Sequence, residues 1–569
     1  MLRSTLERLA LLATIRGDAA TASLFSRAAA VIQSANIESD NELGPFLEAP
    51  PPEADAAMLT QLRYMYEAGA WVLLESAIAD LPADLRWLFE SGAVTIEQLA
   101  ALHAALGVAT ATDVTAELRR KTIRGVSGLD EATETAIATA MPALRSTIAR
   151  IPLGRALSIA QPVLMRLHDA PGFTSAEPVG SLRRGQELVG DIEIVAPVDD
   201  ASAAIEFLLA MPDIATVLQR GPRRAYFLID RVQIGVRCPA PSEAGAALLH
   251  LTGSAAHIEK LGAFASGKGF TLEPEGLSQG GVPARVSHSE EAMYHALGLP
   301  WIPPEIRDGK EEIDIAAKGS LPVLLTRKDI RGDLHMHTQW SDGRDTTDAM
   351  IEQCVALGYE YMAITDHSAR AAAARTLTVD NVKKQADEIA GLRERFPNIA
   401  ILHGCEVDIM ADGKLDFPDR VLERFDIVLA SLHERHGHAP DQLLRRYVSA
   451  MKHPLVSIIT HPTNRILPHR PGYELDWDAF FATAIETRTI VEIDGAPAHL
   501  DMNGVLARQA IAAGVTVSVD SDCHRSEWLD RQMTMGIMMA RRGWVEARHV
   551  LNTRPLPEVR AIIAAKRRR

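Results

Sequence analysis

In the second half of the chain, short runs of apolar and β-branched residues alternate with longer stretches in which apolar residues recur at helical spacing. The runs cover residues 361–364, 399–402, 426–430, 456–459 and 515–519. Such runs, separated by helical stretches, are typical of a βα-repeat with a parallel sheet. A polar motif follows each run. We therefore expect these motifs to meet at the C-terminal ends of the strands, where a β/α barrel builds its active site.

The polar motifs are rich in histidine and carboxylate. They read Asp333-Leu334-His335-Met336-His337, Thr365-Asp366-His367, Gly404-Cys405-Glu406, Ser431-Leu432-His433, Thr460-His461-Pro462 and Asp522-Cys523-His524. A lone histidine in a strand is more often a satisfied polar residue than a ligand, but a set of such clusters at one end of successive strands predicts a metal site. Imidazole and carboxylate suit Zn²⁺, Mn²⁺ or Fe. One zinc ion takes about four ligands, so the number of candidates predicts two or three ions.

From Arg331 to about Thr553 these motifs resemble the PHP (polymerase and histidinol phosphatase) domain, and the opening segment 333–343 and the order of the motifs carry the resemblance. The resemblance implies a distorted seven-stranded β/α barrel with a cluster of three metal ions. Every position of the family's ligand set holds a residue able to bind metal, whereas some are lost in several inactive PHP domains. The implied ligands are His335, His337, Asp342, His367, Glu406, His433, His461, Asp522 and His524.

The first 150 residues predict a helical region, with a break at Pro50-Pro51-Pro52. The segment 126–130 resembles the second hairpin of a helix-hairpin-helix motif, in which glycines let backbone N–H groups approach a DNA phosphate. Asp130 replaces the second glycine of that hairpin, and the expected first hairpin at 81–88 lacks its glycines. DNA binding and a purely structural role therefore both stay open for this region.

A different pattern follows between residues 150 and 240. A short glycine-bounded turn, 180–185, precedes a strand that carries Asp191 and Glu193. Two residues apart on a strand, both carboxylates point to one face. Paired carboxylates on one face are how nucleotidyl transfer holds two Mg²⁺ ions.

This stretch resembles the palm of a family X DNA polymerase, and Thr252-Gly253-Ser254 matches a further family segment. The resemblance implies a nucleotidyltransferase-like palm at 151–240, a thumb at 241–320 and a PHP domain at 330–569, which is the order of domains in bacterial family X polymerases. It implies Mg²⁺ at the palm, bound by Asp191 and Glu193, and a nucleotide bound by Gly180, Ser181, Arg184, Gly253 and Ser254.

One departure from this family concerns the third palm carboxylate. Gln233 stands at its position, in Val232-Gln233-Ile234. A glutamine cannot accept the primer hydroxyl proton or neutralise a metal ion. Asp230 is three residues away and is expected on the opposite face. We therefore expect a polymerase site that is impaired but able to bind a nucleotide.

The composition adds limits. The 569 residues carry a net charge of −15, which does not favour a nucleic-acid binder overall but says little about a local groove. No apolar run has the length of a membrane span, so no membrane partner is expected. Four scattered cysteines, Cys238, Cys354, Cys405 and Cys523, fit a reducing cytoplasm. We expect a cytoplasmic monomer.

Several divalent ions in one pocket predict phosphoester hydrolysis, because they activate a bound water and neutralise the ester. Arg435, Arg465 and Arg470 lie near the ligand motifs. Arg465 matches a family arginine after the His-Pro motif. We expect it to bind a substrate phosphate through its planar fork, with a surface salt bridge as the alternative.

Three functions remain open. The first, which we favour, is a metal-dependent 3′–5′ exonuclease or 3′-end processing enzyme acting on gapped or 3′-end DNA in repair, on a polymerase scaffold with an impaired palm. The second is an active repair polymerase with a PHP nuclease, against which Gln233 argues. The third is a non-enzymatic DNA- or nucleotide-binding scaffold. An open set of many ligands argues against it, since structural zinc sites are closed at four.

Overall fold

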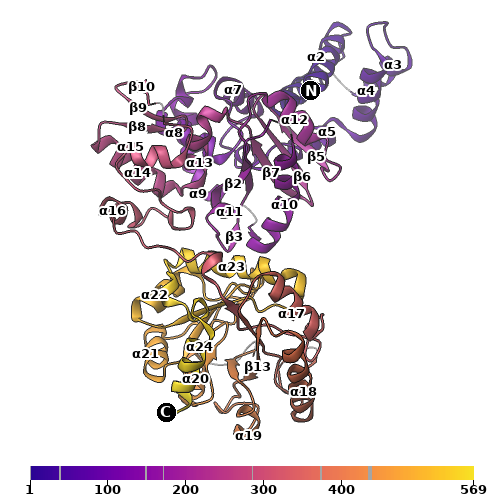
Figure 1. Cartoon of the computed structure of the whole chain (residues 1–569). Helices are drawn as coiled ribbons and strands as arrows, with labels where there is room; N and C mark the ends of the chain where they lie inside the picture. Colours follow the sequence, from indigo (N-terminus) through magenta and orange to yellow (C-terminus); the bar gives the residue numbers. More distant parts are fainter. Residues whose placement is uncertain are drawn as a thin grey trace. The chain divides into compact units, whose positions relative to one another are not determined.

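The computed structural model describes residues 2–37, 40–147, 150–170, 172–284, 286–371, 375–433 and 439–568, so Arg435 lies outside the described residues. The chain divides into two compact units (Figure 1). The first contains residues 1–150, 157–182 and 190–301. The second contains residues 302–569 together with two short segments, Ile151–Ala156 and Arg183–Val189.

The N-terminal region is helical, as its apolar spacing predicts. Helix α1 lies against α2, α5 and α7, and the buried core there consists mainly of leucine, isoleucine and alanine side chains. The predicted proline break falls between α3 and α4. The helices are α1 (Leu2–Arg16), α2 (Ala19–Ser34), α3 (Asp40–Glu48), α4 (Ala56–Ala68), α5 (Ala70–Ala79), α6 (Ala83–Glu90), α7 (Ile96–Leu106), α8 (Ala111–Arg120) and α9 (Glu131–Thr147).

The hairpin-like segment before α9 keeps one of its glycines in the left-handed region, Gly128 at φ +84°. Asp130, which replaces the other glycine, caps the helix. Its carboxylate accepts hydrogen bonds from the backbone N–H and the hydroxyl of Thr133, both at 2.8 Å. An aspartate is a favoured residue at this position of a helix, so it has a local structural role here.

The region predicted to be the palm contains a mixed five-stranded sheet in the order β2-β4-β7-β6-β5, in which β4 and β7 run parallel and the other pairs are antiparallel. Asp230 and Arg231, at φ +48° and +62°, form the two-residue turn between β6 and β7. Asp230 is therefore in a turn and not, as expected, on the far face of a strand. The elements are β2 (Glu177–Pro178), β4 (Ile192–Val195), β5 (Thr216–Arg220), β6 (Arg224–Ile229), β7 (Val232–Arg237), α10 (Leu153–Asp169), α11 (Gly180–Arg183) and α12 (Ala201–Leu209).

The following region combines helices with a small antiparallel sheet, β10-β9-β8. Its elements are α13 (Ala244–Thr252), α14 (Ala255–Gly267), β8 (Thr271–Glu273), β9 (Gly276–Gln279), β10 (Val282–Pro283) and α15 (Glu290–Ala296). The short segments of the second unit form a two-stranded sheet of β1 (Ile151–Pro152) and β3 (Leu188–Val189).

The C-terminal domain is a seven-stranded parallel sheet whose strands are ordered as in the sequence. A parallel bridge between Met336 and Cys523, which follow the first and last strands, brings its two edges together as a nearly closed barrel. The strands are β11 (Gly332–Asp333), β12 (Tyr361–Ile364), β13 (Ala400–Asp408), β14 (Ile427–Ser431), β15 (Ile458–Ile459), β16 (Ile490–Asp494) and β17 (Val517–Asp520).

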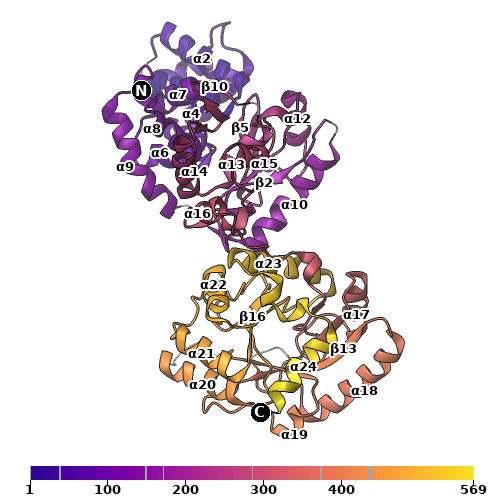
Figure 2. The same ribbon diagram turned by 60° about the vertical axis from the view of Figure 1, so that its left-hand side comes forward.

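Helices surround this barrel (Figure 1, Figure 2). They are α17 (Thr347–Ala356), α18 (Val379–Arg395), α19 (Asp419–Leu422), α20 (Pro440–Lys452), α21 (Trp477–Thr487), α22 (Gly504–Ala513), α23 (Leu529–Arg542) and α24 (Leu556–Arg567), preceded in the linker by α16 (Glu312–Ala317). The predicted apolar runs coincide with β12, β13, β14, β15 and β17, and the predicted fold class is confirmed. Strand β16 is an apolar run that the prediction missed.

Among the described residues, no single helix has both the length and the apolar character needed to cross a bilayer. The bent pair of α7 and α8 meets that test by length and composition only.

Candidate active site

The predicted metal ligands lie at one end of the barrel because each follows, or ends, a parallel strand. His335 and His337 come two and four residues after β11, His433 and His461 come two residues after β14 and β15, and Asp522 and His524 follow β17. Strand β13 is longer than predicted and carries Glu406 within it. The structure brings all of the predicted ligands together in one cluster, in which three groups of side chains each have their ligand atoms within 4.8 Å of one another.

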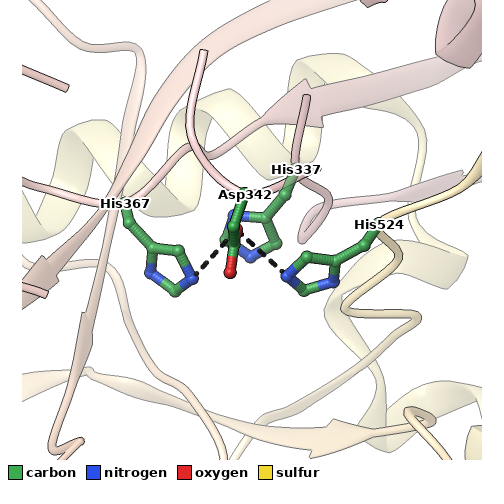
Figure 3. Close-up of side chains that lie close together, drawn as sticks. All are labelled: His337, Asp342, His367 and His524. Atoms are coloured by element: carbon green, nitrogen blue, oxygen red, sulfur yellow. Dashed lines mark ion pairs between the residues drawn. The ribbon is translucent and has the colours of Figure 1, made fainter. Parts of the chain in front are cut away.

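The outermost group contains His337, Asp342, His367 and His524 (Figure 3). The carboxylate of Asp342 lies between two imidazoles, with Oδ1 3.5 Å from His367 Nε2 and 3.2 Å from His524 Nε2. The ring of His337 stacks on those of His367 and His524 at centroid distances of 4.3 and 4.4 Å. The side chains of Asp342 and His524 are 23% and 30% exposed, so this group faces the mouth of the site.

A deeper group contains His335, His337 and Asp522. The Nε2 atoms of the two histidines face each other at 3.1 Å, and Asp522 Oδ1 lies 3.1 Å from His337 Nε2. Both histidines are fully buried.

The third group is centred on Glu406. One of its oxygens, Oε2, lies 2.8 Å from His367 Nδ1. The other, Oε1, lies 3.3 Å from His433 Nε2 and 2.9 Å from His461 Nε2. Glu406 is therefore a carboxylate shared among imidazoles from three other strands.

The charges in this cluster reinforce one another. Burial opposes ionisation of Glu406, but His367 and His433 hold its pKa well below the usual value. Burial likewise opposes the charge of Asp522, and His335 beside it holds the pKa of that carboxyl well below its usual range. Both carboxylates therefore stay ionised and able to bind a cation.

Two further carboxylates orient ligand histidines by contacting Nδ1, the ring nitrogen that faces away from the cluster. Glu492 Oε1, in β16, lies 2.7 Å from His335 Nδ1, and its Oε2 accepts the backbone N–H of His461 at 2.9 Å. Asp408 Oδ1, at the end of β13, lies 2.7 Å from His433 Nδ1. A carboxylate can only accept, so each fixes the proton on Nδ1 and leaves the Nε2 lone pair directed at the cluster.

Two of these side chains come from strained backbone. His461 and Asp522 lie at φ +27° and +48°. Residues other than glycine rarely adopt this region, and such strain concentrates at functional sites.

The residues present fit a set of divalent ions. Imidazole nitrogens and ionised carboxylate oxygens converge there, and Glu406 Oε2 and His367 Nδ1 are buried without a hydrogen-bond partner among the described residues, so a cation is the partner that this set of side chains lacks. Imidazole and carboxylate together match Zn²⁺, Mn²⁺ or Fe.

Arg465 is not free at the mouth of this site. Its side chain is 9% exposed, and Nη1 donates to Glu187 Oε2 at 2.7 Å. Nε donates to the carbonyl of His499 at 2.7 Å, and Nη2 donates to the carbonyl of Leu500. Arg470 in turn donates to the carbonyl and side chain of Asn464. Arg465 is therefore a buried side chain whose guanidinium binds one carboxylate and two backbone carbonyls of the protein. This environment is neither the one expected for a phosphate contact nor that of a surface salt bridge.

In the palm, the two predicted metal-binding carboxylates have different surroundings. Asp191 is exposed and precedes β4, whereas Glu193 is buried within it. Glu193 Oε1 accepts a hydrogen bond from the hydroxyl of Tyr226 at 3.0 Å and lies 3.4 Å from Arg237 Nη2. Arg237 also donates to Asp113 Oδ1 at 2.9 Å. The charge of Glu193 is thus met by a protein cation.

Gln233 has a structural partner. Its Oε1 accepts the backbone N–H of Ala83 at 2.8 Å, at the first residue of α6. The first N–H groups of a helix have no partner within the helix, so this side chain satisfies one of them. Helix α6 therefore lies against the position where a third metal-binding carboxylate is expected.

The predicted nucleotide-binding residues are divided between the units. Gly180, Ser181, Gly253 and Ser254 belong to the first unit and Arg184 to the second. Gly180 has φ +63° and begins α11. Ser254 caps α14, with its hydroxyl accepting the N–H of His257 at 3.0 Å. The described contacts give Ser254 a helix-capping role.

Sequence reasoning missed Glu492, Asp408 and Arg237. Glu492 could have been found from the run Ile490-Val491-Glu492-Ile493, which is rich in β-branched residues and indicates a strand in the same way as the five other runs. Asp408 lies two residues after Glu406, and therefore on the same side of a strand. Arg237 carried no signal, because its partner Asp113 is distant in sequence.

Each half of the chain contains a match to a known protein family. Residues 333–493 match the PHP domain family, and residues 247–308 match the DNA polymerase beta thumb. The chain is 34% identical over 499 residues to DNA polymerase/3′-5′ exonuclease PolX of Bacillus subtilis, covering 86% of each chain. The chain is 31% identical over 206 residues to a probable phosphatase of Thermoanaerobacter sp., covering 34% of this chain and 79% of that protein. A probable phosphatase of Syntrophotalea carbinolica is 29% identical over 203 residues, with the same coverage.

Proposed function

Because this chain belongs to the family X DNA polymerases that carry a C-terminal PHP domain, we propose that its barrel hydrolyses phosphodiester bonds at the 3′ ends of DNA, as a metal-dependent 3′–5′ exonuclease. The chain is an enzyme of this family. The observation that carries the proposal is the convergence of buried imidazoles and carboxylates at the C-terminal end of the barrel. The substrate follows from the name of the Bacillus subtilis relative.

In this proposal two or three divalent ions, Zn²⁺, Mn²⁺ or Fe, bind the three groups of side chains described above. When bound, such ions lower the pKa of a coordinated water and offset the charge of a phosphate ester. Glu406 belongs to the third group and also lies beside the deeper one, since its Oε2 is 3.5 Å from both His335 Nε2 and His337 Nε2. His337 and His367 each belong to two of the groups.

Side chains outside the metal-binding groups orient the ligand histidines. Glu492 and Asp408 hold the Nδ1 protons of His335 and His433, so both rings offer a lone pair to the cluster. Arg465 acts in this proposal as a positioning residue. It fixes the carbonyls of His499 and Leu500, and hence the loop that follows β16, beside His461.

For the palm we propose that metal-dependent polymerisation is lost. Gln233 supports this proposal because it has no charge for a metal ion and is bonded to α6. The pairing of Glu193 with Arg237 supports it further, because Mg²⁺ would have to displace a buried guanidinium. The competing function is an active polymerase, which the name of the Bacillus subtilis relative favours.

We further propose gapped and 3′-end DNA as substrates, a monomer as the working state, and the cytoplasm as the location. The four cysteines are buried and free, which supports a reducing compartment. Light scattering after size-exclusion chromatography tests the monomer, and a dimer at micromolar concentration contradicts it.

The test uses full-length protein stripped with a chelator and then supplied separately with Mn²⁺, Zn²⁺ or Fe²⁺. The substrate is a 5′-labelled oligonucleotide resolved on a gel. Stepwise shortening is expected for the unaltered protein and for the palm control Asp191→Asn. Asp522→Asn in the barrel is expected to abolish the ladder. Shortening that persists in Asp522→Asn, or that disappears in Asp191→Asn, contradicts the proposal.

A further inference from the structure

The mouth of the barrel needs a binding surface for the strand, and Arg465 does not provide it, because its guanidinium is buried among protein acceptors. The proposed ligands with the most exposed side chains are His524, Asp342 and His433, at 30%, 23% and 22%, and the first two belong to the outer group of the cluster (Figure 3). A strand that reaches the outer group from solvent comes close to Asp342 and His524. Cationic groups beside them are therefore the candidates for contacts with its phosphates.

Arg344 is one such group. It lies two residues after Asp342, and its backbone N–H donates to the carbonyl of His524 at 2.8 Å, which sets it beside that ligand. Its side chain is exposed, and within the described part of the chain its guanidinium makes no hydrogen bond or ion pair. The loop is held tightly: a Cβ on Gly343 would lie 2.6 Å from the backbone carbonyl carbon of His337.

Arg375 approaches the same loop from another strand. It belongs to the segment after β12, where the N–H of Leu377 donates to the carbonyl of His367 at 2.8 Å. Arg375 is exposed, and its Nη2 donates to the carbonyl of Gly343 at 3.2 Å. No carboxylate of the described residues forms an ion pair with it. Of these two arginines, neither of which pairs with a carboxylate among the described residues, Arg344 thus belongs to the loop that carries Asp342 and Arg375 contacts it.

Among the described residues beside Asp342 and His524, the other charged side chains are engaged with partners. The carboxylate of Asp345 accepts the N–H and hydroxyl of Ser526 at 2.7 and 2.8 Å. Arg525 pairs with Glu527 at 3.4 Å, and Arg370 lies 3.7 Å from Asp416. Arg344 and Arg375 have no such partner among the described residues.

We propose that Arg344 and Arg375 bind backbone phosphates of a nucleic-acid strand entering the barrel, so that the site takes a polymeric phosphodiester in preference to a single small phosphate ester. This inference rests on the proposed function and names the contacts that give it its substrate class. A guanidinium presents a planar fork that matches two phosphate oxygens. On a chain with a net charge of −15, local cations are needed to hold a polyanion at all.

The test measures binding apart from hydrolysis. Full-length protein treated with chelator is titrated into a 5′-fluorescent single-stranded oligonucleotide of eight residues, and anisotropy is followed at several salt concentrations. The variants are Arg344→Ala, Arg375→Ala and their combination. Arg331→Ala is the matched control. It removes an exposed arginine paired with Glu360 at 2.6 Å, at the N-terminal end of β11 and so at the opposite end of the strand.

Each single variant is expected to weaken binding by about 5- to 10-fold and to flatten the slope of log K against log salt by about 0.7, the value for one phosphate contact with a single strand. Arg331→Ala should change neither quantity. In turnover with Mn²⁺, KM should rise more than kcat falls, and the effect should shrink as the strand is shortened to a dinucleotide.

Binding by the double variant that matches that of Arg331→Ala overturns the inference. So does a loss of turnover that is equal for the dinucleotide and the longer strand, because that result means the arginines only support the loop. If the unaltered protein binds the strand and loses that binding in the double variant, but hydrolyses nothing with any metal, the proposed function fails and the inference stands.

Discussion

Replacing Glu492 by glutamine should weaken metal binding by changing which nitrogen of His335 carries a proton. Glu492 is fully buried and holds three groups at once: His335 Nδ1 at 2.7 Å, the backbone N–H of His461 at 2.9 Å and the hydroxyl of Thr460. The N–H of His461 is always a donor, so a glutamine must turn its amide oxygen towards it. The amide nitrogen then faces His335 and donates to Nδ1.

The consequence is a change of tautomer. With Nδ1 as the acceptor, the proton of neutral His335 moves to Nε2, and the lone pair that faces His337 and Asp522 is lost. Loss of such an outer partner typically lowers metal affinity about 10- to 100-fold. This is about 1.4–2.8 kcal/mol of binding free energy. The size and shape of the side chain barely change, so packing does not explain a loss of this kind.

The assay is a competition titration of chelator-treated full-length protein with a metal indicator, using Mn²⁺ and Zn²⁺. Glu360→Gln serves as the control because that carboxylate is 48% exposed and pairs with Arg331 at the surface. Thermal unfolding of the metal-free proteins checks that the fold is intact. An affinity of Glu492→Gln within two-fold of the unaltered protein, with the fold intact, refutes the reasoning.

Three other substitutions have defined outcomes. Arg465→Ala should lower the unfolding free energy of the second unit by about 2–3 kcal/mol, because it leaves a carboxylate and two carbonyls without their charged donor. Unchanged stability in denaturant titration contradicts this structural role of Arg465. Burial raises the pKa of Asp84 from 3.8 to about 6. The contribution of this carboxyl to the free energy of unfolding is therefore fully present below about pH 4 and is lost as pH rises through 6. Asp84→Asn should therefore stabilise the protein by up to ~3 kcal/mol at pH 7.5 but not at pH 3.5, and equal effects at both values in urea unfolding count against this. Gln233→Asp should leave primer extension absent, because Glu193 stays paired with Arg237, and measurable extension by this variant would show that pairing to be unimportant.

Much of the barrel could be predicted because its signals are local in the sequence. Five apolar runs marked their strands, and most of the side chains named as ligands lie near or shortly after the C-terminal ends of barrel strands, so the parallel arrangement brought them together. The family resemblance is confirmed by the matches to the PHP domain and to the polymerase thumb. Strand β16 could have been predicted from the same kind of run, and Glu492 with it.

The environments of individual side chains could not be predicted in this way. Arg465 has a local motif suited to phosphate, but its partner Glu187 lies 278 residues earlier in the chain. Glu193 lies two residues after Asp191, as a pair of metal-binding carboxylates on one strand would. Its partners in the folded chain, Arg237 and Tyr226, come from other strands of the sheet. Gln233 signals the loss of a carboxylate, whereas its bond to Ala83 depends on how α6 packs against the sheet. Contacts of this range follow only from the folded chain.

The most direct test of the central claim, a hydrolytic barrel joined to a palm that no longer polymerises, is the fate of a 5′-labelled primer on a gapped template. Full-length protein is incubated with Mn²⁺, with and without the four deoxynucleoside triphosphates, and the products are resolved on a gel. The account predicts stepwise shortening in both lanes, and no shortening with Asp522→Asn. Primer lengthening when the triphosphates are present would contradict it.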